Sequence, residues 1–124
     1  MEDFVNFEIA KKLKEKGFRE KCVWHYYDDT KDIYKSSSPQ CYNYGGNTND
    51  AATISQVLKW LRETHNIHIN IYFFRHNGNT ELYWVYSVEN IKEDYEYDWL
   101  FSTKHNTYEE AAMDGIEWVL DNIL

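Results

Sequence analysis

The segment from residue 53 to 88 constrains the fold more than any other, because its hydrophobic spacing changes abruptly along it. Its first part carries apolar residues at helical spacing, namely Ile54, Val57, Leu58 and Leu61. The parts that follow, IHINIYFF and ELYWVYSV, alternate between apolar and polar residues as β-strands do. The segment therefore predicts a helix followed by a β-hairpin.

A type I′ turn at Asn77-Gly78 would set the register of this hairpin and place Ile71 opposite Trp84. One face of the hairpin is then the expected core face and carries Ile69, Ile71, Phe73, Leu82, Trp84 and Tyr86. The other face carries Tyr72, Phe74, Tyr83 and Val85. If helices cover only the core face, these last four side chains form a candidate protein-contact face. The alternative is that the first helix or the segment 28–52 covers them.

Capping residues mark three helices. Asn6 fits the N-cap of a helix over residues 7–16, and Gly17 fits the position just after its end. Thr53 with Gln56 forms a capping box for the second helix. Thr107 opens the last helix, with Glu110 as its box partner and a buried stripe of Ala112, Ile116, Val119 and Ile123.

The remaining strands are less sharply marked. Residues 22–27 and 95–102 alternate as strands do, whereas the pattern fails between Asp28 and Ala52. That stretch holds Pro39 and is either a long loop or a loop with a short strand at 32–35 or 40–44.

Together these elements predict a single α+β domain over residues 1–124. The expected order is helix, strand, an optional second strand, helix, three antiparallel strands and helix, forming a small antiparallel sheet with helices on one face. A chain of 124 residues can bury a genuine core without metals or disulfides.

The charge of the chain argues against nucleic-acid binding. The net charge is −8, and from Thr53 onward five Lys or Arg face twelve Asp or Glu. The order helix, three strands, helix also occurs in double-stranded-RNA-binding domains, but those modules need basic groups that meet phosphates. An acidic body repels phosphate, so we expect no direct contact with nucleic acid.

The sequence also bears on location. No apolar run approaches the roughly 18 residues of a membrane span, and the acidic N-terminus does not read as a secretory signal. We therefore expect no membrane association and a cytoplasmic protein with Cys22 and Cys41 reduced, the alternative being a Cys22–Cys41 disulfide.

No catalytic set emerges from the sequence. Cys22 and His25 lie three residues apart in a strand, hence on opposite faces, and cannot meet as nucleophile and base. Neither a phosphate-binding glycine loop nor a paired Cys-x-x-Cys motif is found. We therefore expect no catalytic residues and no enzyme.

Two patterns could be considered for metal binding. His65 and His68 span a helix-to-strand junction and lack the helical spacing of zinc sites, which favours two exposed or half-exposed histidines without a metal. Asp94, Glu96 and Asp98 alternate on one strand face, where they could share a cation or form a solvated face that discourages edge pairing. Because no calcium-loop pattern surrounds them, we assign no metal site and no cofactor.

Three segments carry a resemblance to a known group of proteins. They are residues 56–71, with the run QVLKWLRETHNIHI, residues 13–18, and the last helix with Tyr108-Glu-Glu-Ala and Gly115-Ile116. They resemble a group of small uncharacterised proteins of gut Bacteroidetes and their phages or prophages. The group's Ala-Pro-Thr before the second helix is Ala51-Ala52-Thr53 here, which loses the proline but keeps the cap. The resemblance implies a shared fold and origin, and it carries no activity.

These observations leave three hypotheses for function. The leading one is a non-enzymatic cytoplasmic module that binds a protein partner or associates with itself. The alternative is an acidic inhibitor that mimics nucleic acid on a host enzyme, with carboxylates aligned in one stripe from Glu93, Asp94, Glu96, Asp98, Glu109 and Asp114. The third is a weak metal-dependent enzyme that uses the histidines or the strand carboxylates.

Overall fold

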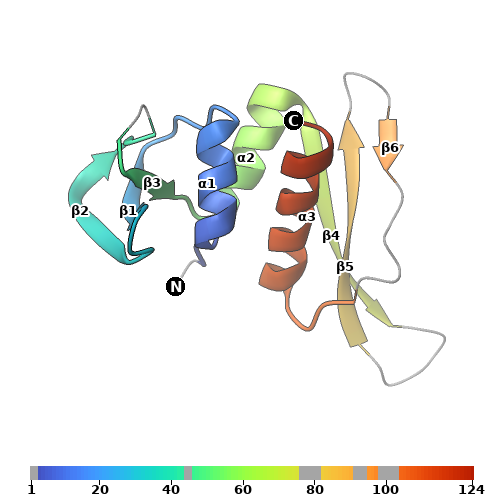
Figure 1. Ribbon diagram of the computed structural model, residues 1–124. Helices are drawn as coiled ribbons and strands as arrows, with labels where there is room; N and C mark the ends of the chain where they lie inside the picture. Colours follow the sequence, from blue (N-terminus) through green and yellow to red (C-terminus); the bar gives the residue numbers. More distant parts are fainter. Residues whose placement is uncertain (1–2, 44–45, 76–81, 91–94, 98–103) are drawn as a thin grey trace. The chain divides into compact units, whose positions relative to one another are not determined.

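The computed structural model describes residues 3–43, 46–75, 82–90, 95–97 and 104–124 (Figure 1). Its elements, in chain order, are α1 Phe7–Glu15, β1 Cys22–Tyr27, β2 Ile33–Gln40, β3 Thr48–Ala51, α2 Ile54–His65, β4 Ile67–Arg75, β5 Leu82–Asn90, β6 Tyr95–Tyr97 and α3 Tyr108–Asn122. The expected α+β class and element order are confirmed. The strands divide between two antiparallel sheets rather than one, with orders β2-β1-β3 and β4-β5-β6.

The chain groups into two compact units. Unit 1 comprises residues 1–57 with Leu124, and unit 2 comprises residues 58–123. The boundary falls within α2, so the first turn of this helix belongs to unit 1 and the remainder to unit 2. The expectation of one domain over the whole chain stays a prediction.

In unit 1, α1 packs against one face of the β2-β1-β3 sheet (Figure 1). The Phe7 ring meets the Tyr26 ring edge-on at 5.8 Å between centroids, and the Phe4 ring lies 5.6 Å from Trp24. Because side chains alternate along β1, His25 and Tyr27 point to the opposite face of the sheet.

Strand β3 is the element that the sequence does not predict. It reads Thr-Asn-Asp-Ala, and its Asn49 and Asp50 side chains are fully buried. Both side chains have polar partners: the Asn49 amide donates to Asp28 at 3.2 Å, and the Asp50 carboxylate accepts from Tyr42 N–H at 3.0 Å. Since no hydrophobic alternation marks such a strand, only its tertiary contacts reveal it. Strand β2 spans residues 33–40, in a stretch expected to be a long loop or to hold only a short strand at 32–35 or 40–44.

The predicted helix caps are present in both α1 and α2. Asn6 accepts a hydrogen bond from Ile9 N–H at 2.9 Å, and Gly17 takes a left-handed φ of 90° just after the helix. At α2 the box is reciprocal. Thr53 N–H donates to the Gln56 amide oxygen at 2.9 Å, and Gln56 N–H donates to the Thr53 hydroxyl at 3.1 Å.

In unit 2 the hairpin pairs β4 with β5, but in a different register from the one expected. Ile71 lies opposite Tyr86 and Phe73 opposite Trp84, whereas the expected turn placed Ile71 opposite Trp84. The turn residues 77 and 78 lie outside the described part of the chain. A partner shift of two residues is even, so every side chain keeps the face that its alternation predicts.

Helix α3 packs on one face of this hairpin, where Gly115 allows the close approach. A Cβ atom at Gly115 would lie 3.0 Å from Ile69 Cγ2 and 3.2 Å from the Tyr86 ring. The buried residues of α3 are Ala111, Ala112, Gly115, Ile116, Val119 and Leu120. Ile123, expected in this stripe, is only half-buried. Strand β6 pairs with β5 through Tyr95–Tyr97, and residues 98–102 of the expected strand fall outside the description.

Candidate functional site

The expected contact face of the hairpin is divided between buried and exposed side chains. Tyr83 is 4% exposed and Val85 is fully buried, so neither presents a side chain to a partner. Tyr72 is 36% exposed and Phe74 is half-buried. Strand β5 is thus buried on both faces along its middle, and the four residues do not form one open patch.

The large exposed apolar side chains lie on the other face, which was expected to be core. Phe73 is 53% exposed and Leu82 is 46% exposed. Both sit where β4 ends and β5 begins, and Figure 1 shows the hairpin continuing past the first turn of α3. Because α3 packs over Ile69 and Tyr86, this end of the face extends beyond the helix. The expectation that Phe73 and Leu82 are core residues is therefore wrong.

Four residues form a connected apolar surface here, which we call the Trp84 cluster: Phe73, Leu82, Trp84 and Tyr108. The Phe73 and Trp84 rings lie 4.8 Å apart, and Tyr108 meets Trp84 at 90° and 5.6 Å. Tyr108, the first residue of α3, is 39% exposed. Ring pairs at these distances and angles attract one another beyond the area that they bury.

The backbone fixes this arrangement. Trp84 N–H donates to the His105 carbonyl at 2.9 Å, and His105 N–H donates to the Trp84 carbonyl at 3.1 Å. The His105 ring lies 3.0 Å from an Asp114 carboxylate oxygen on α3. Two residues later Thr107 caps α3 by accepting from Glu110 N–H at 3.1 Å. These contacts set where α3 begins and hence how much of the hairpin it leaves uncovered.

A second site lies in unit 1, on the sheet face away from α1. His25 is fully buried there, with Nδ1 at 2.7 Å from Asp50 Oδ1 and Nε2 at 3.0 Å from Ser36 Oγ. The Tyr42 ring lies 4.5 Å from the imidazole and the Tyr34 ring lies 5.3 Å from it. No local sequence pattern marks this group, because His25, Ser36 and Asp50 lie on three different strands.

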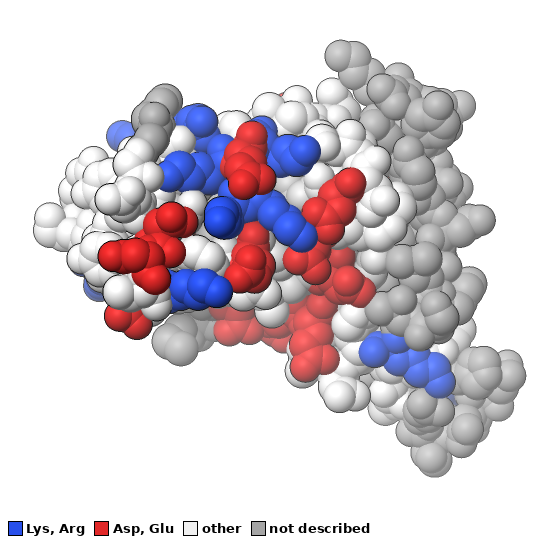
Figure 2. Space-filling model, viewed as in Figure 1, with Lys and Arg blue, Asp and Glu red and all other residues white. Residues whose placement is uncertain are grey.

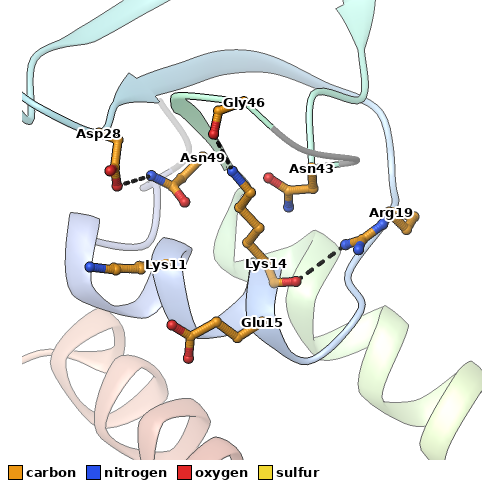
Figure 3. Close-up of a pocket in the computed structure, with 8 residues that line it drawn as sticks. All are labelled: Lys11, Lys14, Glu15, Arg19, Asp28, Asn43, Gly46 and Asn49. Carbon is orange, nitrogen blue, oxygen red and sulfur yellow. Dashed lines mark hydrogen bonds between the residues drawn. The ribbon is translucent and has the colours of Figure 1, made fainter.

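The other face of the same sheet carries a pocket of about 410 Å³ (Figure 3). It is lined by Lys11, Lys14, Glu15, Arg19, Asp28, Asn43, Gly46 and Asn49. Lys14 donates to the Gly46 and Thr48 carbonyls at 3.0 Å and 2.8 Å, and Arg19 donates to the Lys14 carbonyl at 3.3 Å. The Lys14 and Arg19 side chains thus donate to carbonyls of the protein itself. The contacts of Lys14 join α1 to β3 and leave fewer of its donor groups for a ligand.

The cysteines are both free thiols. Burial raises the pKa of Cys22 to about 12, and the charge of Asp50 adds to the shift. Burial also raises the pKa of Cys41. Neither thiol has the lowered pKa of a reactive cysteine at neutral pH.

The candidate metal ligands are not brought together. The His65 ring packs edge-on against Trp60 at 4.7 Å, and His68 lies opposite Glu89 in the hairpin. Within the described ranges, no three His, Cys, Asp or Glu side chains are grouped to hold a metal ion. Asp94 and Asp98, like Glu93 of the expected acidic stripe, fall outside those ranges, and the Glu96 side chain is not described.

Charges of both signs mix over unit 1. On the face shown in Figure 2, Lys and Arg lie among Asp and Glu over unit 1, whereas Asp and Glu alone follow one another where α3 lies. In the described part of the chain, no helix combines the length and apolar character needed to cross a membrane. No family model matches the chain, and neither a curated protein nor a solved structure matches it.

Proposed function

We propose that the protein is a binding module that contacts another protein through the Trp84 cluster, either a partner or a second copy of itself. The observation that carries the proposal is the exposure of Phe73 and Leu82, next to the rings of Trp84 and Tyr108. Contiguous apolar surface of this kind typically marks a contact site.

The composition of the cluster fits the centre of an interface. Aromatic side chains carry much of the binding energy in protein interfaces, since they bury a large area at a low cost in side-chain entropy. The Trp84 cluster is also ordered in advance by its ring contacts and by the Trp84–His105 backbone bonds. A preordered surface loses less entropy on binding, and this favours affinity.

The apolar character of the surface predicts how binding responds to salt. Contacts between apolar side chains are not weakened by screening, whereas contacts between exposed charges are. Arg75 lies opposite Leu82 at the margin of the cluster and supplies a polar rim. A partner held by the cluster should therefore remain bound when the salt concentration is raised.

Tagged protein can be passed through a lysate of a gut Bacteroidetes cell at low and moderate salt, with Phe73→Ser and Leu82→Ser as test variants. Tyr72→Ser is the matched control, because Tyr72 is exposed on the opposite face of the same strand. The proposal predicts either that a partner stays bound at moderate salt or that the protein self-associates with rising concentration in the ultracentrifuge. The Phe73→Ser and Leu82→Ser variants should lose this binding, and Tyr72→Ser should keep it. Equal retention by all three variants would refute it.

Glu109 and Asp114 of the expected stripe are five residues apart on α3 and do not share one side of it, but a different acidic stripe on this helix supports the second candidate, the nucleic-acid mimic. Glu110, Asp114, Glu117 and Asp121 recur at spacings of four, three and four residues, which places them along one side of the helix. Helix α3 contains no Lys or Arg. If the protein is a nucleic-acid mimic, it should capture a nucleic-acid enzyme in a salt-sensitive way. The double variant Glu110→Gln with Asp121→Asn should weaken this capture, and Phe73→Ser should leave it unchanged.

A further inference from the structure

We propose that Ser36 is a nucleophile, with His25 as its general base and Asp50 as the group that orients the base, and that this site reacts with small carboxylic esters. The site lies in unit 1, on the face of the sheet away from α1. It does not depend on partner binding by the Trp84 cluster.

The distances are those that nucleophilic catalysis requires. His25 Nε2 lies 3.0 Å from Ser36 Oγ, and His25 Nδ1 lies 2.7 Å from Asp50 Oδ1. A nucleophile within hydrogen-bond reach of a base, with that base oriented by a carboxylate, is recognised by geometry and not by order in the sequence. Here the three residues come from β1, β2 and β3, with His25 in the middle strand.

The hydrogen bonds of Asp50 fix the tautomer of His25. Its carboxylate accepts from Tyr42 N–H at 3.0 Å and can only accept from His25 Nδ1. The Nδ1 atom therefore carries a proton, and in the neutral imidazole the lone pair of Nε2 faces Ser36. This is the tautomer that a general base needs.

The hydroxyl of Ser36 has one proton and three acceptors within reach. His25 Nε2 lies at 3.0 Å, the Val23 carbonyl at 3.1 Å and the Ser38 carbonyl at 2.7 Å. Rotation about the Cβ–Oγ bond of Ser36 turns the hydroxyl hydrogen from a carbonyl oxygen toward His25 Nε2 without moving Oγ. In that orientation His25 can take the proton as Ser36 Oγ attacks.

Ser36 lies at the start of a bulge in β2, on the face of the sheet that Tyr34 and His25 share. Trp24 lies opposite Lys35 and Cys22 opposite Gln40, so residues 36–39 together face Val23 alone. Bulges of this kind redirect side chains and occur often beside active sites. Ser37 and Ser38 in the same bulge are exposed, whereas Ser36 is half-buried against His25.

Tyrosine rings enclose the base and suggest the substrate class. Tyr34 and Tyr42 flank the imidazole, and Tyr27 stacks on Tyr34 at 4.4 Å. The imidazole between them is fully buried. Tyr42 and Tyr27 are exposed and offer an aromatic surface to an acyl group. Esters of small apolar or aromatic acids fit this chemistry.

The reaction has two balanced steps with water as the only co-reactant. Ser36 Oγ forms a bond to the acyl carbon, its proton passes to His25 Nε2, and the ester C–O bond breaks as the alcohol leaves with that proton. Water then attacks the acyl-serine, giving up a proton through His25, and releases the acid with Ser36 restored.

The test uses a fluorophosphonate probe, with the labelled residue located by mass spectrometry, and the hydrolysis of p-nitrophenyl acetate. Ser37→Ala and Ser38→Ala are matched controls, since both serines are neighbours of Ser36 without a bond from their hydroxyl oxygen to His25. The proposal predicts that the probe forms its adduct on Ser36 and that wild type is labelled roughly 100-fold faster than Ser36→Ala. The labelling rates of Ser37→Ala and Ser38→Ala should be close to that of wild type.

His25→Gln and Asp50→Asn test the base and its orienting group, and circular dichroism reports whether they fold. If either fails to fold, the comparison among the three serine variants decides alone. Labelling that is no faster than in Ser36→Ala, or an adduct spread over Ser37 and Ser38, would overturn the proposal. The three hydrogen-bonded residues would then serve only to hold the sheet together.

Discussion

The backbones of Trp84 and His105 exchange two hydrogen bonds, at 2.9 Å and 3.1 Å, and this pairing sets the limit of the cover that α3 gives to the hairpin. It holds the chain against β5 just before the helix begins. Tyr108 then meets Trp84 edge-on at 5.6 Å, and Phe73 and Leu82 lie beyond the helix. The exposed cluster is thus a consequence of where one helix starts.

Replacing Phe73 with Ser should change stability little. Its side chain is 53% exposed, so the apolar area lost from the folded state is small, and we expect a cost of less than about 1 kcal/mol. Urea unfolding followed by circular dichroism measures it. A loss of several kcal/mol would show that Phe73 is part of the core and would remove the basis for a contact surface there.

Gly115→Val should destabilise the protein by about 1–3 kcal/mol through overpacking against β4 and β5. The first added carbon would already lie 3.0 Å from Ile69 and 3.2 Å from the Tyr86 ring. Gly115→Ala adds only that carbon and gains helix propensity, so its effect should be smaller. If both variants are as stable as wild type in chemical unfolding, α3 does not pack at this distance.

Thr53→Ala should lower stability by about 1 kcal/mol. The change removes the hydroxyl that accepts from Gln56 N–H at 3.1 Å at the start of α2. Thr53→Ser keeps this acceptor and serves as the matched control. The two variants can be compared by thermal unfolding, where the alanine variant should melt several degrees lower and the serine variant close to wild type.

Much of the fold follows from local sequence. Asn6, Gly17 and Thr53 are found in the capping roles that their positions predict. The alternation around Ile69 and Tyr86 gives the faces of the hairpin correctly, since an even register shift preserves them. These features depend on residues close together in the chain, and local patterns record such contacts well.

The candidate sites depend on contacts that are distant in sequence. Alternation shows that Phe73 shares a face with Tyr86, but only the packing of α3 shows that Tyr86 is buried and Phe73 exposed. Asp50 lies 25 residues from its partner His25, and Ser36 lies 11 residues from it. No spacing rule joins them, because the strands that bring them together are set by tertiary pairing.

Cys22 predicts a pH dependence of stability. Burial, with a smaller contribution from the charge of Asp50, raises its pKa from 9.0 to about 12. The folded state therefore favours the neutral thiol. Stability from this group is fully present below pH 9.0, and it is lost as pH rises from there to about 12. Wild type should lose stability over this range more steeply than Cys22→Ala.

Denaturant unfolding at several pH values between 8 and 11 provides the test for Cys22. Cys41→Ala is the control, because Cys41 is only half-buried and should contribute a smaller alkaline loss. The same burial predicts that a thiol reagent reacts with Cys41 before Cys22 in the native protein. Parallel pH profiles for wild type and Cys22→Ala would contradict the account of this residue.

The capture experiment with Phe73→Ser and Tyr72→Ser tests the central claim most directly. The two substitutions remove exposed aromatic rings from neighbouring positions of β4 that point to opposite faces. If the Trp84 cluster is the contact surface, wild type and Tyr72→Ser retain the same protein at moderate salt and Phe73→Ser does not. Retention by Phe73→Ser with loss by Tyr72→Ser would contradict the claim and assign binding to the opposite face.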